Sequence, residues 1–342
     1  MPTDELFDVL AAVGAERCLL LGDDAAGLRA VLVIDDVTLG PAAGGIRTMR
    51  YPTLAAAVRD AARLARAMTY KNALAGLDAG GGKVVVIDRP ELDRPAAFAR
   101  LGQFVQELGG LFRTAGDVGT GGDDLAHMAR SCDYVHTDEE RLADAVARGV
   151  LRCIEACAAE RDKPAGASGL RVAVQGCGAI GGAVARRLVD AGAQLVVADA
   201  VAERATVLAE QVGAEVIDPG DVLSADVDVL APCALGGVIT ADSVGQLRCW
   251  AVCGAANNTV ADAAAADALR ARGVLYVPDV VSSAGAVIAG IGKTVMNLAD
   301  TTPLIDALGD TAKTLLEQSA ASGRNTEELA IELAQQRIRA NA

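Results

Sequence analysis

The sequence predicts an α/β protein of two domains, the second built on a doubly wound parallel sheet. The first observation is length, because 342 residues are enough for two domains with separate cores. The second is composition: 52% of the residues are apolar but only 3% are aromatic, which suits aliphatic helices packed on a parallel sheet. The third is a repeated alternation of short β-branched runs with helical patterns.

Strand and helix patterns alternate in the first part of the chain. Short apolar runs predict strands at residues 30–34 and 83–87, the second with Lys83 at its entrance. A helix is predicted at residues 53–68, because Pro52 precedes an apolar stripe at helical spacing. Lys71 would follow just after that helix. Two further helices are expected at residues 94–109 and 123–130.

A long helix expected at residues 138–160 leads into the second part of the chain. Turn-forming residues at 161–169 predict a loop. Strands are then predicted at residues 171–175, 195–198, 227–231, 250–253 and 274–277. Helical segments between them, the first running through Ala191, complete the pattern of a Rossmann-type sheet. The tail is expected to hold two helices, which open at Thr302 and Asn325.

The net charge and the cysteine content argue against several classes of function. A net charge of -14 argues against nucleic acid or an anionic membrane as the main partner. The eight cysteines form no Cys-x-x-Cys pair and the two histidines lie far from them in sequence, so no metal site is expected and reduced cysteines are preferred to zinc ligands. No signal peptide and no apolar run of bilayer-spanning length is recognised, so a cytoplasmic location is expected.

A glycine fingerprint follows the strand predicted at residues 171–175. Gly176 would permit a tight turn, Gly178 would let the backbone approach a pyrophosphate, and Gly181 would let the helix pack close to the strand. Asp199 lies eighteen residues beyond Gly181, where a carboxylate accepts hydrogen bonds from a ribose hydroxyl and repels a 2′-phosphate. The pattern favours NAD, although the nearby Arg204 leaves NADP open. The alternative is a tight turn that binds no ligand.

Two lysines and one aspartate are candidates for the chemistry. Lys71 lies in the segment 68–73, Lys83 follows three glycines, and Asp117 lies among small residues at 114–120. The glycine–lysine stretch is not a phosphate loop, because Leu77 and Val84 stand where glycine and Ser or Thr are needed. Glycines would allow a ligand to approach the backbone closely, and a lysine in a dry cleft beside another cation can act as an acid or a base. The alternative is two exposed lysines and a turn residue.

The order and spacing of these motifs resemble the Glu/Leu/Phe/Val dehydrogenase family, and most closely its leucine, valine and phenylalanine dehydrogenase branch. The resemblance covers most of the chain. The matching stretches are residues 39–47, 68–73, 75–77, 80–83, 114–120, 176–181, 231–236, 254–258 and 276–288. It implies a substrate domain at residues 1–140, an NAD-binding Rossmann domain at 141–295, and C-terminal helices at 296–342 that return toward the first domain. The family fold places catalysis between the domains.

The resemblance also implies an activity: reversible oxidative deamination of an L-amino acid to its 2-oxo acid and ammonia, with NAD as hydride acceptor. Lys83 would be the acid/base, Asp117 would assist proton transfer, and Lys71 would bind the substrate carboxylate. The other implied substrate-binding residues are Gly44, Gly45, Met68, Ala115, Ser283 and Val287. The implied cofactor-binding residues are Gly176, Gly178, Ala179, Ile180, Gly181, Asp199, Cys233, Ala234 and Asn257, with Asn258 as the alternative to Asn257. A homo-oligomer is implied as well.

Three positions depart from the family pattern. Val146 stands where a threonine would hydrogen-bond the nicotinamide amide, Ser283 replaces an asparagine that would touch the substrate, and Gly116 replaces an acidic residue. Small residues at Ala43 and Gly290 suggest a roomy pocket for a bulky or aromatic side chain. An apolar amino acid is therefore the expected substrate. The alternatives are a relative that acts on an atypical oxo acid or imine, and a catalytically impaired NAD-binding protein.

Overall fold

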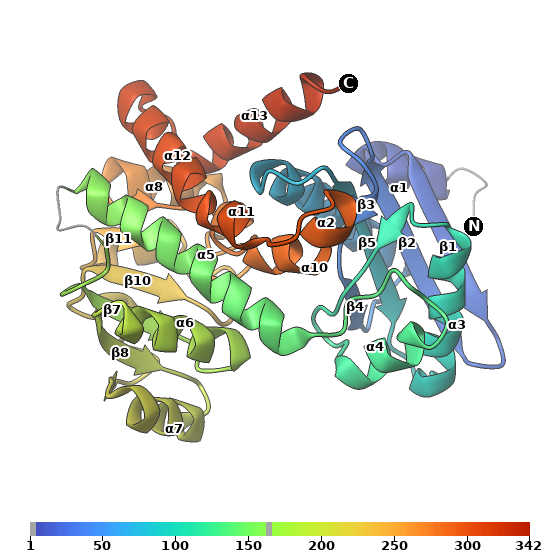
Figure 1. The fold of residues 1–342 in the computed structure, drawn as a ribbon, viewed down its shortest axis with the longest axis horizontal. Helices are drawn as coiled ribbons and strands as arrows, with labels where there is room; N and C mark the ends of the chain where they lie inside the picture. The colour runs from blue at the N-terminus through green and yellow to red at the C-terminus, as the bar shows by residue number, and fades with distance from the viewer. Residues whose placement is uncertain (1–4, 162–165) are drawn as a thin grey trace. The chain divides into compact units, whose positions relative to one another are not determined.

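The computed structural model describes residues 5–161 and 166–342, and it divides the chain into two compact units. The first unit contains residues up to Glu139 together with Gly290–Ala299 and Gln335–Ala342. The second contains Glu140–Ala289 and Asp300–Ala334. Figure 1 shows the course of the chain through both units. Among the described residues, no helix is both long enough and apolar enough to cross a membrane.

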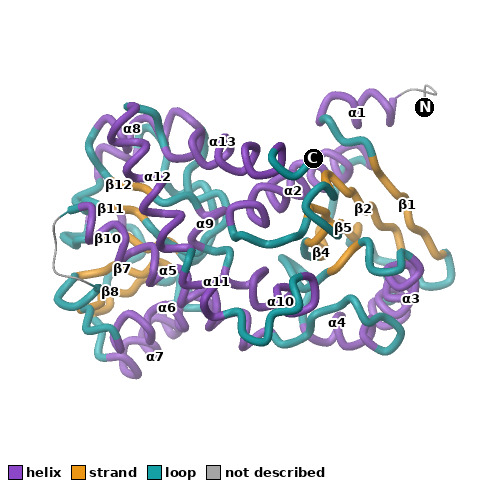
Figure 2. The backbone as a smooth tube through the Cα atoms, turned by 45° about the horizontal axis from the view of Figure 1, so that its top comes forward, coloured by secondary structure: helices purple, strands orange, loops and turns teal. Residues whose placement is uncertain are grey.

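The first unit is built on a six-stranded mixed sheet. Its strand order is β1-β2-β5-β3-β6, with β4 also paired to β5, and Figure 2 shows β1 as the outermost strand. Strand β2 runs antiparallel to both β1 and β5, whereas β3 and β4 run parallel to β5. The elements are α1 Glu5–Val13, β1 Arg17–Asp23, β2 Leu28–Asp36, β3 Ala42–Ala43, β4 Ile46–Met49, α2 Leu54–Leu74, β5 Gly80–Ile87, α3 Arg94–Glu107, β6 Phe112–Arg113 and α4 Gly122–Ala129.

Helices cover both faces of this sheet, because successive strand residues point to opposite sides. Val31 and Val85 pack in one core with apolar residues of α1 and α2. Leu32 and Val84 pack in a second core with apolar residues of α3 and α4. Lys83 alternates with Val84 and therefore shares the α2 face of the sheet with Val85. The sheet thus turns Lys83 toward the helix that carries Lys71.

Two of the predicted boundaries in this unit were wrong. Helix α2 continues to Leu74, so Lys71 lies in its last turn rather than after it. Strand β5 begins at Gly80, so Lys83 lies inside the strand rather than at its entrance. Asn72 is fully buried, and the glycines pair with neighbouring strands.

The second unit contains the parallel sheet that the sequence predicts. Its order is β12-β11-β10-β7-β8-β9, so the chain moves outward from β7 in one direction and then from β10 in the other. The bounds are β7 Arg171–Gln175, β8 Gln194–Ala198, β9 Glu215–Val216, β10 Val229–Pro232, β11 Ala251–Val252 and β12 Leu275–Tyr276. Val172 and Ala173 point to opposite faces and are both fully buried, so the sheet is covered on both sides.

Helices pack against this sheet and continue into the tail. Their bounds are α5 Glu139–Glu160, α6 Ala179–Asp190, α7 Ala202–Val212, α8 Ala263–Ala271, α9 Asp279–Ser282, α10 Gly285–Val295, α11 Thr302–Asp306, α12 Leu308–Ser322 and α13 Thr326–Arg339, with short 3-10 helices at Val222–Ser224 and Ser243–Gln246. The tail therefore holds three helices, not the two predicted. Asp306 at the end of α11 accepts hydrogen bonds from Arg148 and Arg152 of α5, which favours a separate short helix here.

Candidate active site

A buried ion pair joins Lys83 of β5 to Asp117 in the loop between β6 and α4. Lys83 Nζ lies 2.7 Å from Asp117 Oδ2, and the two side chains are only 6% and 15% exposed. Burial lowers the pKa of Lys83 below its ordinary value, although Asp117 opposes the change. Burial alone would raise the pKa of Asp117, but Lys83 and Arg47 outweigh it and hold that pKa below the usual range. The pair combines an ionised carboxylate with an amine that can release its proton.

A second cation and a second carboxylate extend this pair. Arg47 on β4 donates from Nε to Asp117 Oδ2 at 3.1 Å and from Nη1 to Asp60 Oδ2 at 3.4 Å. Asp60 on α2 also accepts from the Tyr51 hydroxyl at 2.7 Å. The sequence analysis assigned no role to Arg47, Asp60 or Tyr51. Arg47 could have been noticed as a lone charge two residues after Gly45 in a stretch that matches the family.

The glycines around the site bring backbone segments together. A Cβ at Gly81 would clash with the backbone of Thr69 on α2, and one at Gly44 would clash with the carbonyl of Gly82. A Cβ at Gly82 would lie 2.9 Å from the Phe112 ring. The glycines before Lys83 therefore serve close packing of protein elements, whereas the sequence analysis had assigned them to close approach of a ligand.

Gly45 alone of these glycines adjoins the charged pair directly. A Cβ at Gly45 would lie 3.2 Å from Lys83 Nζ, 3.0 Å from Asp117 Cβ and 2.9 Å from the Gly116 carbonyl oxygen. A side chain at this position would compete with anything that approaches the amine. The structure thus brings Gly45, Lys83 and Asp117 together as one cluster.

Lys71 lies near the same cluster. Its charge acts on Lys83 and contributes to lowering the Lys83 pKa. Met68, one turn earlier on α2, lies beside Gly44, where a Cβ would come within 3.2 Å of its Cγ. Asn72, the residue after Lys71, donates from Nδ2 to the Gly80 carbonyl at 2.5 Å and so ties α2 to the start of β5. Ala115 precedes Asp117 in the same loop, and its carbonyl accepts from Ile46 N at 2.9 Å.

The glycine fingerprint of the second unit forms a tight turn between β7 and α6. Gly176 has a φ of 99°, and a Cβ at Gly181 would clash with the Gly176 carbonyl oxygen. A Cβ at Gly178 would meet nothing within 4 Å, so space is open beside the backbone that begins α6 at Ala179 and Ile180. Asp199 accepts from Cys177 N at 2.7 Å and from Val201 N at 2.8 Å, which fixes its carboxylate beside the turn. These residues fit a dinucleotide.

The loop after β10 lies against this turn, as the strand order requires. A Cβ at Gly181 would come within 3.3 Å of the Cβ of Cys233, and one at Gly176 within 2.7 Å of the Cβ of Ala234. Both residues follow β10, which neighbours β7 at the point where the strand order reverses. Asn257 is exposed, and a Cβ at Gly236 would clash with its carbonyl oxygen. The glycine fingerprint, Asp199 and the loop after β10 therefore surround the point where the strand order reverses. Doubly wound sheets bind ligands at this point.

Two of the three departures from the family pattern, Val146 and Ser283, lie in the second unit, whereas Gly116 lies in the first. Ser283 is buried, and its hydroxyl donates to the Asp279 carbonyl at 2.6 Å. Val146 on α5 is buried, and a Cβ at Gly285 would lie 2.8 Å from its backbone nitrogen. Val287 follows on α10, where it is half-buried. The side chain of Val146 offers no hydrogen-bonding group.

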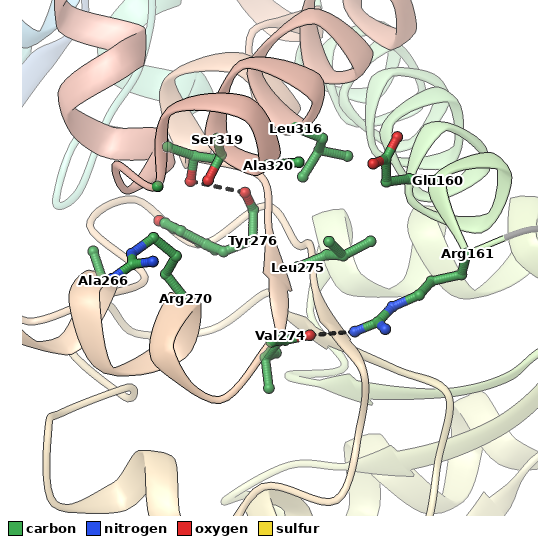
Figure 3. Close-up of a pocket in the computed structure, with 13 residues that line it drawn as sticks. Glu160, Arg161, Ala266, Arg270, Val274, Leu275, Tyr276, Leu316, Ser319 and Ala320 are labelled. Carbon is green, nitrogen blue, oxygen red and sulfur yellow. Dashed lines mark hydrogen bonds between the residues drawn. The ribbon is translucent and has the colours of Figure 1, made fainter.

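A separate pocket of about 340 Å³ lies in the second unit, and none of the predicted site residues lines it. Figure 3 shows Arg161 donating to the carbonyl of Gly273 at its rim. The backbone carbonyl of Tyr276 accepts from the hydroxyl of Thr326 at 2.9 Å. These polar groups bond within the protein, and the pocket lies among α5, α8, β12, α12 and α13.

Two cysteines lie beside the glycine turn of the second unit. Burial raises the pKa of Cys233 to about 12, and that of Cys177 to about 11. All eight are free thiols. In the described part of the chain, no group of three or more His, Cys, Asp or Glu side chains is arranged to hold a metal ion.

Comparison with known proteins agrees with this geometry. Residues 22–134 match the Glu/Leu/Phe/Val dehydrogenase dimerisation domain, and residues 197–302 match the Glutamate/Leucine/Phenylalanine/Valine dehydrogenase family. Leucine dehydrogenase of Geobacillus stearothermophilus is 39% identical over 291 residues, which cover 83% of this chain and 79% of that protein. Phenylalanine dehydrogenase of Lysinibacillus sphaericus is 37% identical over 83% of this chain and 77% of its own length.

A solved structure extends the likeness to the whole chain. The crystal structure of L-tryptophan dehydrogenase from Nostoc punctiforme superposes with a TM-score of 0.84 at 32% identity, covering 98% of this chain and 99% of that one. The shared fold covers nearly the full length of both chains, and the sequence identity is high enough to show the family. The chain belongs to the Glu/Leu/Phe/Val dehydrogenase family of amino acid dehydrogenases, oxidoreductases that act on CH–NH2 donors and use NAD(P).

Proposed function

We propose that the protein catalyses reversible NAD-dependent oxidative deamination of an L-amino acid with an apolar, branched-chain or aromatic side chain. The observation that carries the proposal is the buried Lys83–Asp117 pair with Gly45 against it. A lysine whose pKa is lowered by burial can exchange protons near neutrality. Relatives named as leucine, phenylalanine and tryptophan dehydrogenases support an apolar substrate.

In the proposed mechanism, Lys71 binds the substrate carboxylate and Lys83 does the proton chemistry. Lys83 takes a proton from water as that water attacks the carbon of the substrate imine, and returns it to the nitrogen as ammonia leaves. Asp117 keeps the Lys83 amine oriented and supplies a compensating negative charge when Lys83 is protonated. Overall, the amino acid and water give the oxo acid, ammonia, one hydride and one proton. Gly44, Gly45, Met68, Ala115, Ser283 and Val287 are proposed to contact the substrate.

The proposed cofactor is NAD. It would take the hydride from the substrate α-carbon. Gly176, Gly178 and the first amides of α6 would hold its pyrophosphate, and Asp199 would accept hydrogen bonds from its adenosine ribose. The rest of the NAD site would be lined by Cys233, Ala234 and Asn257. The open space at Gly178 supports this assignment, and the fixed Asp199 carboxylate supports NAD over NADP.

The test follows NADH absorbance with leucine, valine, isoleucine, phenylalanine, tryptophan, alanine and glutamate, each with NAD and with NADP. Turnover of leucine or phenylalanine with NAD is expected; a marked preference for alanine or valine would contradict a roomy pocket. Lys83→Ala should lower kcat by about 10³-fold or more, because general acid–base catalysis contributes about 10²–10⁴-fold. Lys313→Ala is the matched control, since Lys313 is 60% exposed on α12. Near-normal turnover of Lys83→Ala would refute its assigned role.

A second candidate, action on an atypical oxo acid or imine, is favoured by Val146 and Ser283. The buried side chain of Val146 cannot hydrogen-bond a nicotinamide amide, and the Ser283 hydroxyl donates to the Asp279 carbonyl. The reverse reaction distinguishes the candidates. Amination of simple 2-oxo acids with ammonium supports the first, whereas NADH oxidation only with cyclic imines supports the second.

We also propose a homo-oligomer. The match over residues 22–134 is to a domain described as a dimerisation domain. Strand β1 supports the proposal because it is a seven-residue edge strand, and such edges commonly pair with another chain. Light scattering should give a mass at least twice 34.7 kDa. A monomer at micromolar concentration would contradict the proposal.

A further inference from the structure

Asp117 shares one carboxylate oxygen between two cations. Its Oδ2 lies 2.7 Å from Lys83 Nζ and 3.1 Å from Arg47 Nε. The Arg47 side chain is 14% exposed, close to the 15% of Asp117. Charges this poorly hydrated interact more strongly than charges on a protein surface. The positive charge of Arg47 therefore acts on the same carboxylate that holds the ammonium form of Lys83.

Arg47 is fixed at both ends. Its backbone lies in β4, where it is paired in register with Val85 of β5. At its tip, Nη1 donates to Asp60 Oδ2, and Asp60 is held in turn by Tyr51 at 2.7 Å and by Arg63 at 2.9 Å. Asp60 is on α2, the helix that carries Lys71. The guanidinium thus has a defined position relative to Asp117.

The ion pair is not needed to hold the Asp117 loop in place. Backbone hydrogen bonds join Ile46 N to the Ala115 carbonyl and Thr48 N to the Val118 carbonyl, both at 2.9 Å. The hydroxyls of Thr48 and Thr120 lie 2.7 Å apart in a buried contact. Because β4 and the loop are already joined on both sides of Asp117, the charge of Arg47 points to a role beyond attachment.

We propose that Arg47 is a positioning residue that keeps Asp117 ionised and limits how tightly Asp117 holds the ammonium form of Lys83. The inference rests on the proposed acid/base role of Lys83. With Arg47 present, the Asp117 oxygen is divided between two donors, and Lys83 can give up its proton at lower pH. Without Arg47, the carboxylate would attract only the lysine, which would remain protonated in the range where a base is needed.

The charges of the surrounding groups support this role for Arg47. Burial and Asp117 have the largest effects on the pKa of Lys83. Arg47 has the next largest effect and lowers that pKa, and Lys71 acts in the same direction. Burial raises the pKa of Asp60, but Tyr51, Arg63 and Arg47 outweigh it and keep that pKa below the usual value. Burial and Asp60 raise the pKa of Tyr51. Asp60 and Tyr51 therefore do not titrate near neutrality.

The chain allows a direct measurement, because it contains only five lysines: Lys71, Lys83, Lys163, Lys293 and Lys313. Protein labelled with 13C at the lysine ε-carbon can be titrated by NMR, with the Lys83 signal assigned from Lys83→Met. In Arg47→Gln, the Lys83 midpoint should rise by about one pKa unit, as expected for the loss of a nearby like charge. Arg47→Lys keeps the charge and should leave the midpoint nearly unchanged. Arg63→Gln, which removes the other arginine on Asp60, is the matched control.

The kinetic readout should move in parallel. The low-pH limb of the kcat/KM profile should shift upward by about the same one unit in Arg47→Gln, with activity recovered at high pH. An unmoved Lys83 midpoint in folded Arg47→Gln, or an equal loss of rate at every pH, would overturn the proposal. If Arg47→Gln does not fold, Asp60→Asn takes its place. In that variant Arg47 is released toward Asp117, so the Lys83 midpoint should fall. An unchanged midpoint in Asp60→Asn would overturn the proposal. The titration needs no turnover, so it separates this inference from a failure of the proposed function.

Discussion

Gly81 of β5 packs directly against the backbone of Thr69 on α2, so closely that no side chain fits between them. The same contact brings the helix of Lys71 next to the strand of Lys83. Thr69 is further held by its hydroxyl, which donates to Asp35 Oδ2 at 2.7 Å. The separation between the helix of Lys71 and the strand of Lys83 therefore depends on this glycine.

Gly81→Ala should destabilise the protein by about 3 kcal/mol, because overpacking against backbone cannot be relieved by a side-chain rotation. Surviving folded protein should show a lower kcat, since α2 must move away from β5. Urea unfolding and NADH assays measure both effects. Gly245→Ala is the control, because Gly245 is exposed and a Cβ there meets nothing within 4 Å. Equal stability of the two variants would show that the helix–strand contact is looser than described.

Gly178 and Gly181 should respond differently to the same substitution. A Cβ at Gly181 clashes with the Gly176 carbonyl, so Gly181→Ala should lower Tm even without cofactor. A Cβ at Gly178 meets only open space, so Gly178→Ala should fold normally but bind NAD at least about 10-fold more weakly, a loss of about 1.4 kcal/mol. Thermal melts and calorimetric titration with NAD distinguish the two. Unchanged NAD affinity in Gly178→Ala would place the pyrophosphate elsewhere.

Asp199→Asn should weaken the preference for NAD over NADP by about 10-fold or more, because removing a charge that repels a 2′-phosphate is worth at least about 1.4 kcal/mol. The asparagine keeps an acceptor for the Cys177 amide, although it cannot reproduce both hydrogen bonds. The measurement is the ratio of kcat/KM for the two cofactors. Glu203→Gln, an exposed acid in the first turn of α7, is the control for a general change in local charge. An identical ratio in both variants would argue that Asp199 has only a structural role.

Glu327→Gln tests a partly buried carboxyl in the second unit. Burial and the nearby Asp279 raise the pKa of Glu327 to about 7, and its Oε1 accepts from the Tyr276 hydroxyl at 2.7 Å. An acid with a raised folded pKa binds more protons when folded, so its contribution to stability is lost as pH rises from about 4.5 to about 7. Relative to the parent, Glu327→Gln should gain about 2 kcal/mol of unfolding free energy between pH 5 and pH 8.

The control for that experiment is Glu328→Gln, because Glu328 is exposed and paired with Arg324 at 3.3 Å. Its stability difference from the parent should change little over the same pH range. Denaturant unfolding at pH 5 and pH 8 provides the comparison. A Glu327→Gln difference that does not depend on pH would mean that the carboxyl is ionised in the folded protein at both values.

Local sequence patterns were sufficient for the second unit. The strand at Arg171–Gln175, the glycine turn and the acid at Asp199 are close in the chain, and hydrophobic run length and glycine spacing determine their structure directly. The doubly wound class of the sheet could also be predicted, because parallel strands joined by helices have few arrangements. The tail was less predictable. The break before Leu308 depends on Arg148 and Arg152, which lie more than 150 residues away.

For the first unit, the sequence by itself determined the candidate groups for the chemistry: Lys71, Lys83 and Asp117 were singled out from motifs and their settings. Only the tertiary structure decided that Arg47 and Asp60 belong to the same cluster and that the glycines before Lys83 serve packing. The physical reason is the sequence separation of the residues that interact. A helix, a strand or a tight turn is set by neighbours within a few residues, whereas a buried charge network is set by chain segments that meet only after the sheet has formed. Arg47 and Asp117 are 70 residues apart in sequence and 3.1 Å apart in space.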